Sequence, residues 1–156
     1  MSDDFTPLTG RCMCGAVEIS TAAPFVGALF CHCKRCQRRS GTTRSMTALC
    51  PAGAFSVTAG EDKVRVCDPG DGWRKAFCVD CGSHTHTISP DDPTLVAIRL
   101  GCLDQDPGIR PQAHQFVAYT SSLEPLPTMG YPASPSDSER PSRSECVDSF
   151  PRAPSG

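Results

Sequence analysis

The segment CHCKRC at residues 31–36 constrains this chain more than any other feature, because it places three thiols and one imidazole within six residues. A disulfide uses two thiols and leaves the third over, and cysteines so close in sequence would close a small strained ring. A metal ion can bind all three thiolates at once. The segment therefore predicts a metal site formed by Cys31, Cys33 and Cys36.

Two further segments carry cysteines at ligand spacing: RCMCG contains Cys12 and Cys14, and FCVDCGS contains Cys78 and Cys81. A Cys-x-x-Cys-Gly unit can turn two thiolates onto one tetrahedral zinc ion at about 2.3 Å, because the glycine permits a tight backbone turn. One such unit is half of a four-cysteine site. Spacing alone allows either Cys-x-Cys pair to complete it, the RCMCG pair or the first two thiols of CHCKRC.

A division of the clustered cysteines into four and three predicts one closed zinc site and one with an open position, which is typical of a catalytic or ligand-accepting zinc. Two other interpretations remain. The cysteines could be small buried apolar residues, although core packing gives no reason for the repeated spacing. The second zinc could also be purely structural, with a histidine, water or another side chain as its fourth ligand.

The overall composition restricts the location and the partners. The chain contains 11 cysteines, an odd number that cannot pair completely, and its start, MSDDFTP, lacks the basic and apolar regions of a signal peptide. We therefore expect the reducing cytoplasm, where clustered cysteines more often bind metals than form disulfides. No apolar run approaches the roughly 20 residues that cross a bilayer, which predicts no membrane partner. The net charge of −2 provides no basic field for nucleic acid.

Short segments of alternating polarity dominate the chain and predict a mainly β fold. Turn signals at 58–62 and 68–72 favour antiparallel neighbours, and residues 34–41 could form one short helix. From 128 to 156 the sequence is rich in proline and serine, which predicts a disordered tail after a domain at 1–127. The expected strands fall within 16–21, 55–60, 63–68, 84–89, 94–100 and 114–120.

The order G-x-C-x-C-G, C-H-C-x-x-C and F-C-x-x-C-G-S, followed by LGCLD and AHQFVAYTSSLEPLP, closely resembles the glutathione-dependent formaldehyde-activating enzyme family, which includes the centromere protein V branch. The resemblance covers about residues 10–127 and implies a β-rich, Mss4-like zinc-binding fold of antiparallel sheets. It also implies two zinc ions per chain. The structural zinc would be bound by Cys12, Cys14, Cys78 and Cys81, and the catalytic zinc by Cys31, Cys33 and Cys36.

The resemblance further implies that the catalytic zinc binds the thiol of glutathione, or of a similar small thiol, and presents the sulfur to formaldehyde or another small aldehyde. The product would be S-hydroxymethylglutathione, and the reaction class carbon–sulfur lyase. The alternative is a non-catalytic, zinc-stabilised binding module of the centromere protein V type. A strong basic extension would be expected for that role, and residues 128–156 mix both signs of charge without a positive block.

Cations and histidines surround these motifs. Basic residues could stabilise a thiolate-rich zinc site and steer the carboxylates of glutathione, or they could form a solvated face. His32 alternates with its cysteine neighbours and should point away from their metal. His84 and His86 should share one strand face, either as a polar sheet surface or in metal binding or proton transfer. They stand in an HTH segment where the family usually has apolar residues. The candidate glutathione-binding cations are Lys34, Arg35, Arg38 and Arg39, with Arg44 nearby.

Overall fold

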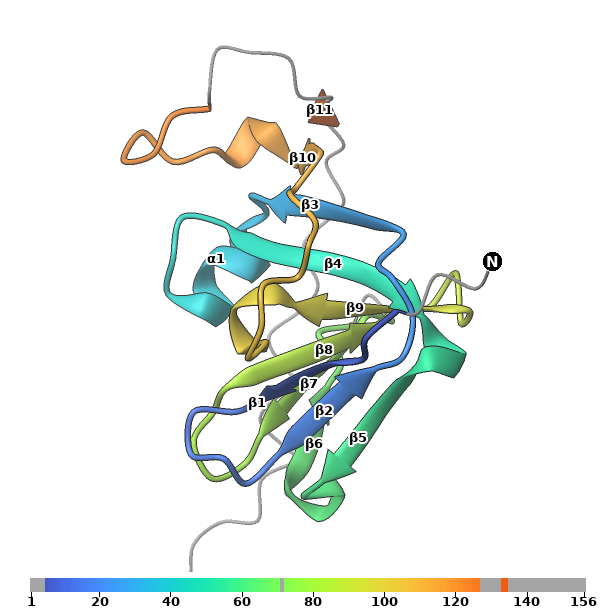
Figure 1. Cartoon of the computed structure of the whole chain (residues 1–156). Helices are drawn as coiled ribbons and strands as arrows, with labels where there is room; N and C mark the ends of the chain where they lie inside the picture. The colour runs from blue at the N-terminus through green and yellow to red at the C-terminus, as the bar shows by residue number, and fades with distance from the viewer. Residues whose placement is uncertain (1–4, 71, 127–132, 135–156) are drawn as a thin grey trace, which may run out of the picture.

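The computed structural model of the chain describes residues 5–70, 72–126 and 133–134. Within these residues, two β-sheets and a short α-helix form the fold (Figure 1). The prediction of a mainly β fold is confirmed. Short 3₁₀ turns connect the strands at Ala52–Ala54, Glu61–Lys63, Leu100–Cys102 and Val117–Tyr119.

The smaller sheet is antiparallel and has the strand order β1-β2-β5. It contains β1 (Leu8–Arg11), β2 (Glu18–Thr21) and β5 (Phe55–Ala59). The first two strands form a hairpin in which Leu8 pairs with Thr21 and Arg11 with Glu18. The turn of this hairpin carries Cys12 and Cys14, so the sheet positions the first two clustered thiols.

The larger sheet has the strand order β11-β10-β3-β4-β9-β8-β7-β6 within the described residues. Its pairings from β3 to β6 are antiparallel, as predicted, whereas β10 pairs in parallel with both β3 and β11. The sheet is therefore mixed. Its strands are β3 (Gly27–Cys31), β4 (Ser45–Pro51), β6 (Val64–Cys67), β7 (Arg74–Cys78), β8 (His84–Ile88), β9 (Leu95–Arg99), β10 (Ala113–Gln115) and β11 (Ala133–Ser134).

The core lies where the two sheets pack together, and it is small. Ile19 of the smaller sheet and Ile98 of the larger one are almost completely buried, and Phe55 and Val57 of β5 pack against the same cluster. Two clustered cysteines belong to this core. The remaining buried members are Cys12, Val17, Cys50, Cys78 and Val96. With so few large apolar residues, a metal ion that joins the two sheets would add materially to stability.

The helix α1 (Lys34–Ser40) follows β3 directly and lies beside β4 (Figure 1). Its N-cap is Cys33, whose Sγ accepts a hydrogen bond from the backbone N–H of Cys36. Gly41 ends the helix with φ of 68°, a left-handed conformation that glycine adopts without strain, and its N–H donates to the carbonyl of Gln37. The predicted short helix is therefore confirmed, together with its end.

The predicted strands are found with one partial exception, because the segment 114–120 is extended only over β10. Phe116 takes φ of 57° and the chain then forms a 3₁₀ turn, so the second half of that prediction is wrong. The proposed tail at 128–156 lies outside the described residues except for β11. Among the described residues, no helix has the length and apolar character to cross a bilayer.

Candidate metal centres and the adjoining cavity

The thiols of Cys31, Cys33 and Cys36 converge where β3 meets α1. Their sulfur atoms all lie within 4.8 Å of one another. Cys31 and Cys36 are buried and Cys33 is half-buried, because the first ends a strand and the others occupy the N-cap and first turn of the helix. Three soft thiol ligands in this arrangement could hold a metal ion such as zinc.

The three thiols of this cluster differ in how readily they ionise. Hydrogen bonds from Cys31 and Cys33 lower the pKa of the Cys36 thiol, and Ser45 and the charge of Arg99 lower it further. Hydrogen bonds with Cys33 and Cys36, together with burial, raise the pKa of Cys31, and the pKa of Cys33 is raised as well. The backbone N–H of Cys36 donates to Cys33 Sγ over 3.3 Å. Cys36 is therefore the first of the three to become the thiolate that a metal ion requires, and the other two would lose their protons when a metal binds.

His32, between the first two of these cysteines, points away from them, as the alternation of side chains predicts. Its Nε2 atom lies 2.8 Å from Nδ1 of His114 on β10, and both rings are buried. Burial is the main cause that lowers the pKa of each, so the pair is held neutral. His114 also contacts the ring of Phe30 on β3, with 5.1 Å between ring centroids. The pair therefore holds β10 against the end of β3, next to the three-thiol cluster.

The four predicted glutathione-binding cations of α1 take different positions. Lys34 is exposed and donates to Gln37 Oε1 over 3.0 Å, and Arg38 is exposed as well. Arg35 is half-buried. Only Arg39 lines the cavity described next, and it donates through Nη2 to the carbonyl of Ala76 on β7 over 2.7 Å.

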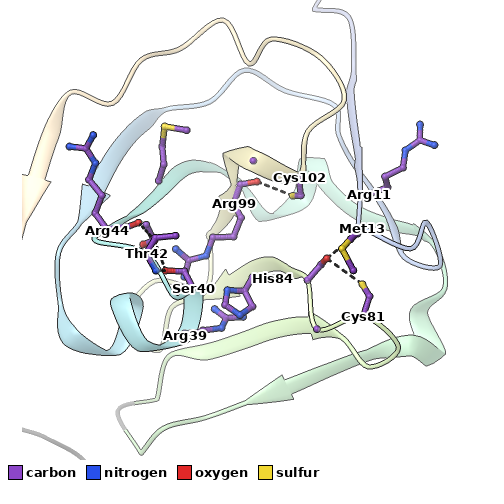
Figure 2. Close-up of a pocket in the computed structure, with 15 residues that line it drawn as sticks. Arg11, Met13, Arg39, Ser40, Thr42, Arg44, Cys81, His84, Arg99 and Cys102 are labelled. Carbon is purple, nitrogen blue, oxygen red and sulfur yellow. Dashed lines mark hydrogen bonds between the residues drawn. The ribbon is translucent and has the colours of Figure 1, made fainter. Parts of the chain in front are cut away.

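A cavity of about 580 Å³ lies between this cluster and the turn that follows β7 (Figure 2). Ser45 and Arg39 line it near the cluster, whereas Cys81 and Ser83 line it at the other end. No aspartate or glutamate of the described chain belongs to its lining, which makes the cavity basic. Four arginines line it: Arg11, Arg39, Arg44 and Arg99. Sequence reasoning did not identify Arg99, because a single arginine at the end of a strand carries no motif.

The two histidines of β8 do not share a face, contrary to the prediction. Lys75 of β7 pairs with Thr87 of β8, whereas Phe77, two residues later, pairs with His84, three residues away from Thr87. The extra residue in β8 is a bulge, and it reverses the alternation of side chains along that strand. His84 therefore lines the cavity, whereas His86 packs on Phe55 of the smaller sheet, with ring centroids 4.6 Å apart. Burial, with a contribution from Arg39, lowers both pKa values to about 4.

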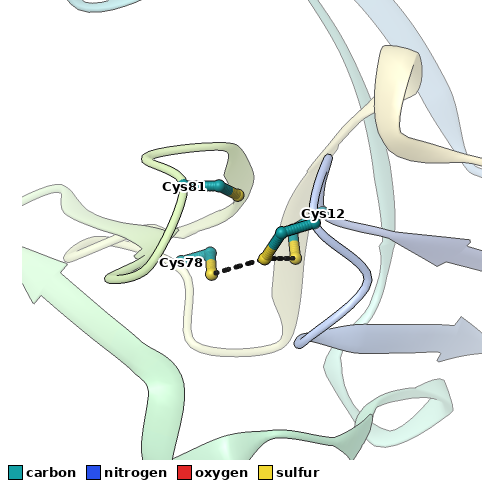
Figure 3. Close-up of side chains that lie close together, drawn as sticks. Cys12, Cys78 and Cys81 are labelled. Carbon is teal, nitrogen blue, oxygen red and sulfur yellow. Dashed lines mark hydrogen bonds between the residues drawn. The ribbon is translucent and has the colours of Figure 1, made fainter.

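The second group of thiols is formed by Cys12, Cys14, Cys78 and Cys81 at the junction of the two sheets (Figure 3). All four sulfur atoms lie within 4.8 Å of one another. The Sγ atoms of Cys12 and Cys14 are 3.5 Å apart, and those of Cys14 and Cys78 are 3.9 Å apart. A tetrahedral zinc ion with bonds of about 2.3 Å separates its ligands by about 3.8 Å, so the observed spacing fits such an ion.

Backbone turns and one serine hold these thiols in place. Gly15 and Gly82 have φ of 78° and 75°, and each N–H donates back to the carbonyl of the first cysteine in its turn. The Ser83 hydroxyl accepts a hydrogen bond from the Met13 N–H over 2.9 Å and lies 3.2 Å from Cys81 Sγ. Its hydrogen bonds lower the pKa of Cys81 to about 6. Ser83 thus ties the two cysteine turns to each other.

Comparison with known proteins agrees with this geometry. The family description "Glutathione-dependent formaldehyde-activating enzyme" matches residues 7–119. The chain belongs to this family. The matched segment contains both groups of clustered cysteines, and either group could hold a metal ion. The fold is also similar to that of a Rhodobacter sphaeroides protein of known crystal structure, with a TM-score of 0.53 and 27% identity over 66% of this chain and 91% of the other.

Several fungal proteins that carry the family's name are similar in sequence. A Penicillium rubens protein is 33% identical over 118 residues, 72% of this chain and 60% of its own length. A Podospora anserina protein is 30% identical over 126 residues, 78% of this chain and 58% of its own length. The chain therefore spans about three-fifths of the length of the curated relatives it matches.

Proposed function

We propose that this chain binds glutathione, or a related small thiol, beside Cys31, Cys33 and Cys36 and promotes its addition to formaldehyde. The product is S-hydroxymethylglutathione, and the reverse reaction makes the protein a carbon–sulfur lyase. The observation that carries the proposal is the position of the three-thiol cluster, whose Cys36 neighbours Ser45 and Arg99, two residues that line a basic cavity large enough for a small molecule. Membership of the family supports the choice of thiol and aldehyde.

The two cysteine groups fit two zinc ions with different roles. The four-thiol group provides a complete tetrahedral set, as a structural zinc requires. The three-thiol group lacks a fourth protein ligand among the described residues. A zinc ion held there would supply Lewis acidity, which lowers the pKa of a thiol that joins it.

The residues of the chain would bind and orient the reactants. Arg39 and Arg99 of the cavity, which form no ion pair with a carboxylate of the described chain, attract an anionic thiol. In the addition, the thiol first loses its proton to water, and a lone pair of the thiolate sulfur then forms the new bond to the carbonyl carbon of formaldehyde. The π electrons of the carbonyl move to its oxygen, which takes a proton back from the solvent, so that thiol and aldehyde combine with no net gain or loss of protons. Because thiol and formaldehyde also combine unaided, proximity would provide much of the acceleration.

The test is the rate at which formaldehyde and glutathione exchange with their adduct, measured by NMR exchange spectroscopy at equilibrium. We expect the zinc-loaded chain to accelerate this exchange in proportion to protein concentration and Cys36→Ser to abolish the acceleration. Cys50→Ala is the matched control, because it removes a buried thiol that belongs to neither cluster. If glutathione binds but exchange stays at the uncatalysed rate, the protein is a binding module and the lyase proposal is wrong.

A further inference from the structure

The four arginines of the cavity fall into two pairs with different partners. Arg11 forms an ion pair with Asp104 over 3.0 Å, and Arg44 pairs with Glu124 while its guanidinium lies 4.0 Å from the centre of the Phe30 ring. These two charges are already compensated. Arg39 of α1 and Arg99 of β9 form no ion pair with a carboxylate in the described part of the chain.

The guanidinium groups of Arg39 and Arg99 each donate one hydrogen bond and each keep one further N–H without an acceptor among the described residues. Arg39 donates from Nη2 to the carbonyl of Ala76, and Arg99 donates from Nη1 to Thr47 Oγ1 over 2.9 Å. Arg39 Nη1 and Arg99 Nε are buried and have no hydrogen-bond partner among the described residues. Buried donors without acceptors cost free energy, and a ligand that supplies acceptors would recover it.

His84 forms the third side of this group and adds no charge. In Figure 2, its ring lies with the side chains of Arg39 and Arg99 in the same part of the cavity. Burial and the two arginines hold the imidazole neutral by lowering its pKa to about 4. A neutral ring can donate or accept a single hydrogen bond, so the group as a whole is suited to an anion with oxygen acceptors.

The unpaired N–H donors of this pair, rather than net charge, indicate the chemistry of the ligand. Three thiolates on a divalent ion carry one negative charge, and a thiolate ligand on the same ion would bring this to two, equal to the two guanidinium charges. Arg39 and Arg99 nevertheless each keep an N–H donor without an acceptor among the described residues. A carboxylate suits these donors best, because its two coplanar oxygens fit the N–H fork of arginine.

We propose that Arg39 and Arg99 form the receptor for a carboxylate of the thiol ligand, an inference that rests on the proposed function in taking that ligand to be a thiol. The preferred substrates are thus thiols that carry a carboxylate, and neutral or cationic aminothiols are poor ligands. The receptor is built from α1 and β9 and depends on the register that brings the end of β9 beside the helix. Arg38, one residue away on α1, is exposed and has no part in it.

The test is calorimetric titration of the zinc-loaded full chain with glutathione, glutathione diethyl ester and S-methylglutathione. The diester lacks the carboxylates, and the S-methyl compound keeps them but has no free thiol. We expect the diester to bind at least about tenfold more weakly than glutathione, as for the loss of a charge-assisted hydrogen bond. Arg99→Gln should weaken the binding of glutathione by a similar factor and leave the affinity for the diester unchanged. The glutathione affinity of Arg99→Lys should fall between those of the parent and Arg99→Gln.

The matched control is Arg11→Gln, the same substitution at a cavity arginine that is already paired with Asp104, and it should leave all three affinities unchanged. Circular dichroism and zinc content verify that each variant is folded. If Arg99→Gln does not fold, the proposal is tested by the same titrations of Arg39→Gln and by the affinities of the parent for glutathione and its diester. The proposal is overturned if the parent binds glutathione and its diester with equal affinity. It is also overturned if Arg99→Gln weakens the binding of these two compounds by the same factor.

S-methylglutathione separates this inference from the proposed function. If it binds as tightly as glutathione and depends equally on Arg99, the carboxylate receptor stands and binding through the thiol is wrong. If glutathione binds much more tightly than both analogues and Arg99→Gln weakens it selectively, both proposals are supported. If none of the three compounds binds, both proposals fail.

Discussion

The two cysteine groups use the same chemistry in opposite surroundings. The group of Cys12, Cys14, Cys78 and Cys81 joins two sheets, and two of its members are part of the hydrophobic core. The group of Cys31, Cys33 and Cys36 is local, with all its thiols within one strand end and one helical turn. Its Cys36 neighbours Ser45 and Arg99 of the basic cavity, whose other end is lined by Cys81 of the first group. If the two groups have the structural and reactive roles proposed above, the neighbours of a thiol cluster, more than its ligand atoms, distinguish those roles.

Breaking the four-thiol group should have the largest effect. Cys78→Ser removes a buried ligand that joins the two sheets, and metal binding in small zinc domains supplies on the order of 10 kcal/mol of folding free energy. We expect Cys78→Ser to lose most of its β structure in circular dichroism and to retain less than the parent's metal in elemental analysis. A variant that stays folded at the parent's melting temperature would show that the core alone holds the sheets together.

Breaking the three-thiol group should leave the fold largely intact. Cys36→Ser alters a site that no second sheet depends on, so we expect loss of one of two zinc ions and of glutathione binding without loss of secondary structure. Elemental analysis and calorimetry on the same sample measure both. If Cys36→Ser unfolds as fully as Cys78→Ser, the difference between the groups disappears and the second site is structural.

Acid should destabilise the core beside the four-thiol group through His86. The pKa of this buried ring is lowered from its ordinary 6.5 to about 4, so the unfolded chain binds more protons in this range. Its stabilising contribution is complete above about pH 6.5 and is lost as the pH falls toward 4, to an extent on the order of 2 kcal/mol. His86→Phe keeps a ring against Phe55. We expect the denaturant midpoint of this variant to change less with pH between 4 and 6.5 than that of the parent. An identical pH dependence in both proteins would exclude His86 as the cause.

Ser83 should make the smallest contribution. Ser83→Ala removes the acceptor of the Met13 N–H and the hydrogen bonds to Cys81, and we expect a loss of about 1 kcal/mol with both zinc ions retained. Urea denaturation measures the change. Ser56→Ala, on an exposed position of β5, is the control and should be neutral. A loss of zinc in Ser83→Ala would mean that the serine is needed to assemble the site.

Local patterns in the sequence predicted the local parts of this fold. The spacing of the cysteines and the alternation in segments such as 94–100 were sufficient, because both reflect contacts between neighbours in sequence. Five strands were missed. Gly27–Cys31 and Ser45–Pro51 lack a regular alternation of polar and apolar residues, Leu8–Arg11 and Arg74–Cys78 are short, and Ala133–Ser134 lies in the segment expected to be disordered. Their pairing comes from tertiary contacts, which override local preference.

The cavity could not be predicted in the same way. Arg99 meets Arg39 because β9 pairs with β4 and β8, and no spacing in the sequence reports that register. The extra residue in β8 similarly separates His84 from His86, which simple alternation placed together. Sequence patterns therefore identified the groups that could hold a metal ion, and the structure was needed to identify which cations face the cavity.

The span of chain enclosed by the four-thiol group has a consequence for biosynthesis. Cys14 and Cys78 are 64 residues apart, so this group is incomplete until Cys81 has left the ribosome, and bringing its ends together costs loop entropy. The three-thiol group is complete within one short segment that emerges much earlier. Metal uptake by stalled nascent chains ending before residue 70 would reveal this order, and chains that bind no metal would refute it. The reactive site would then acquire its metal first, while the scaffold that shields it is still being made.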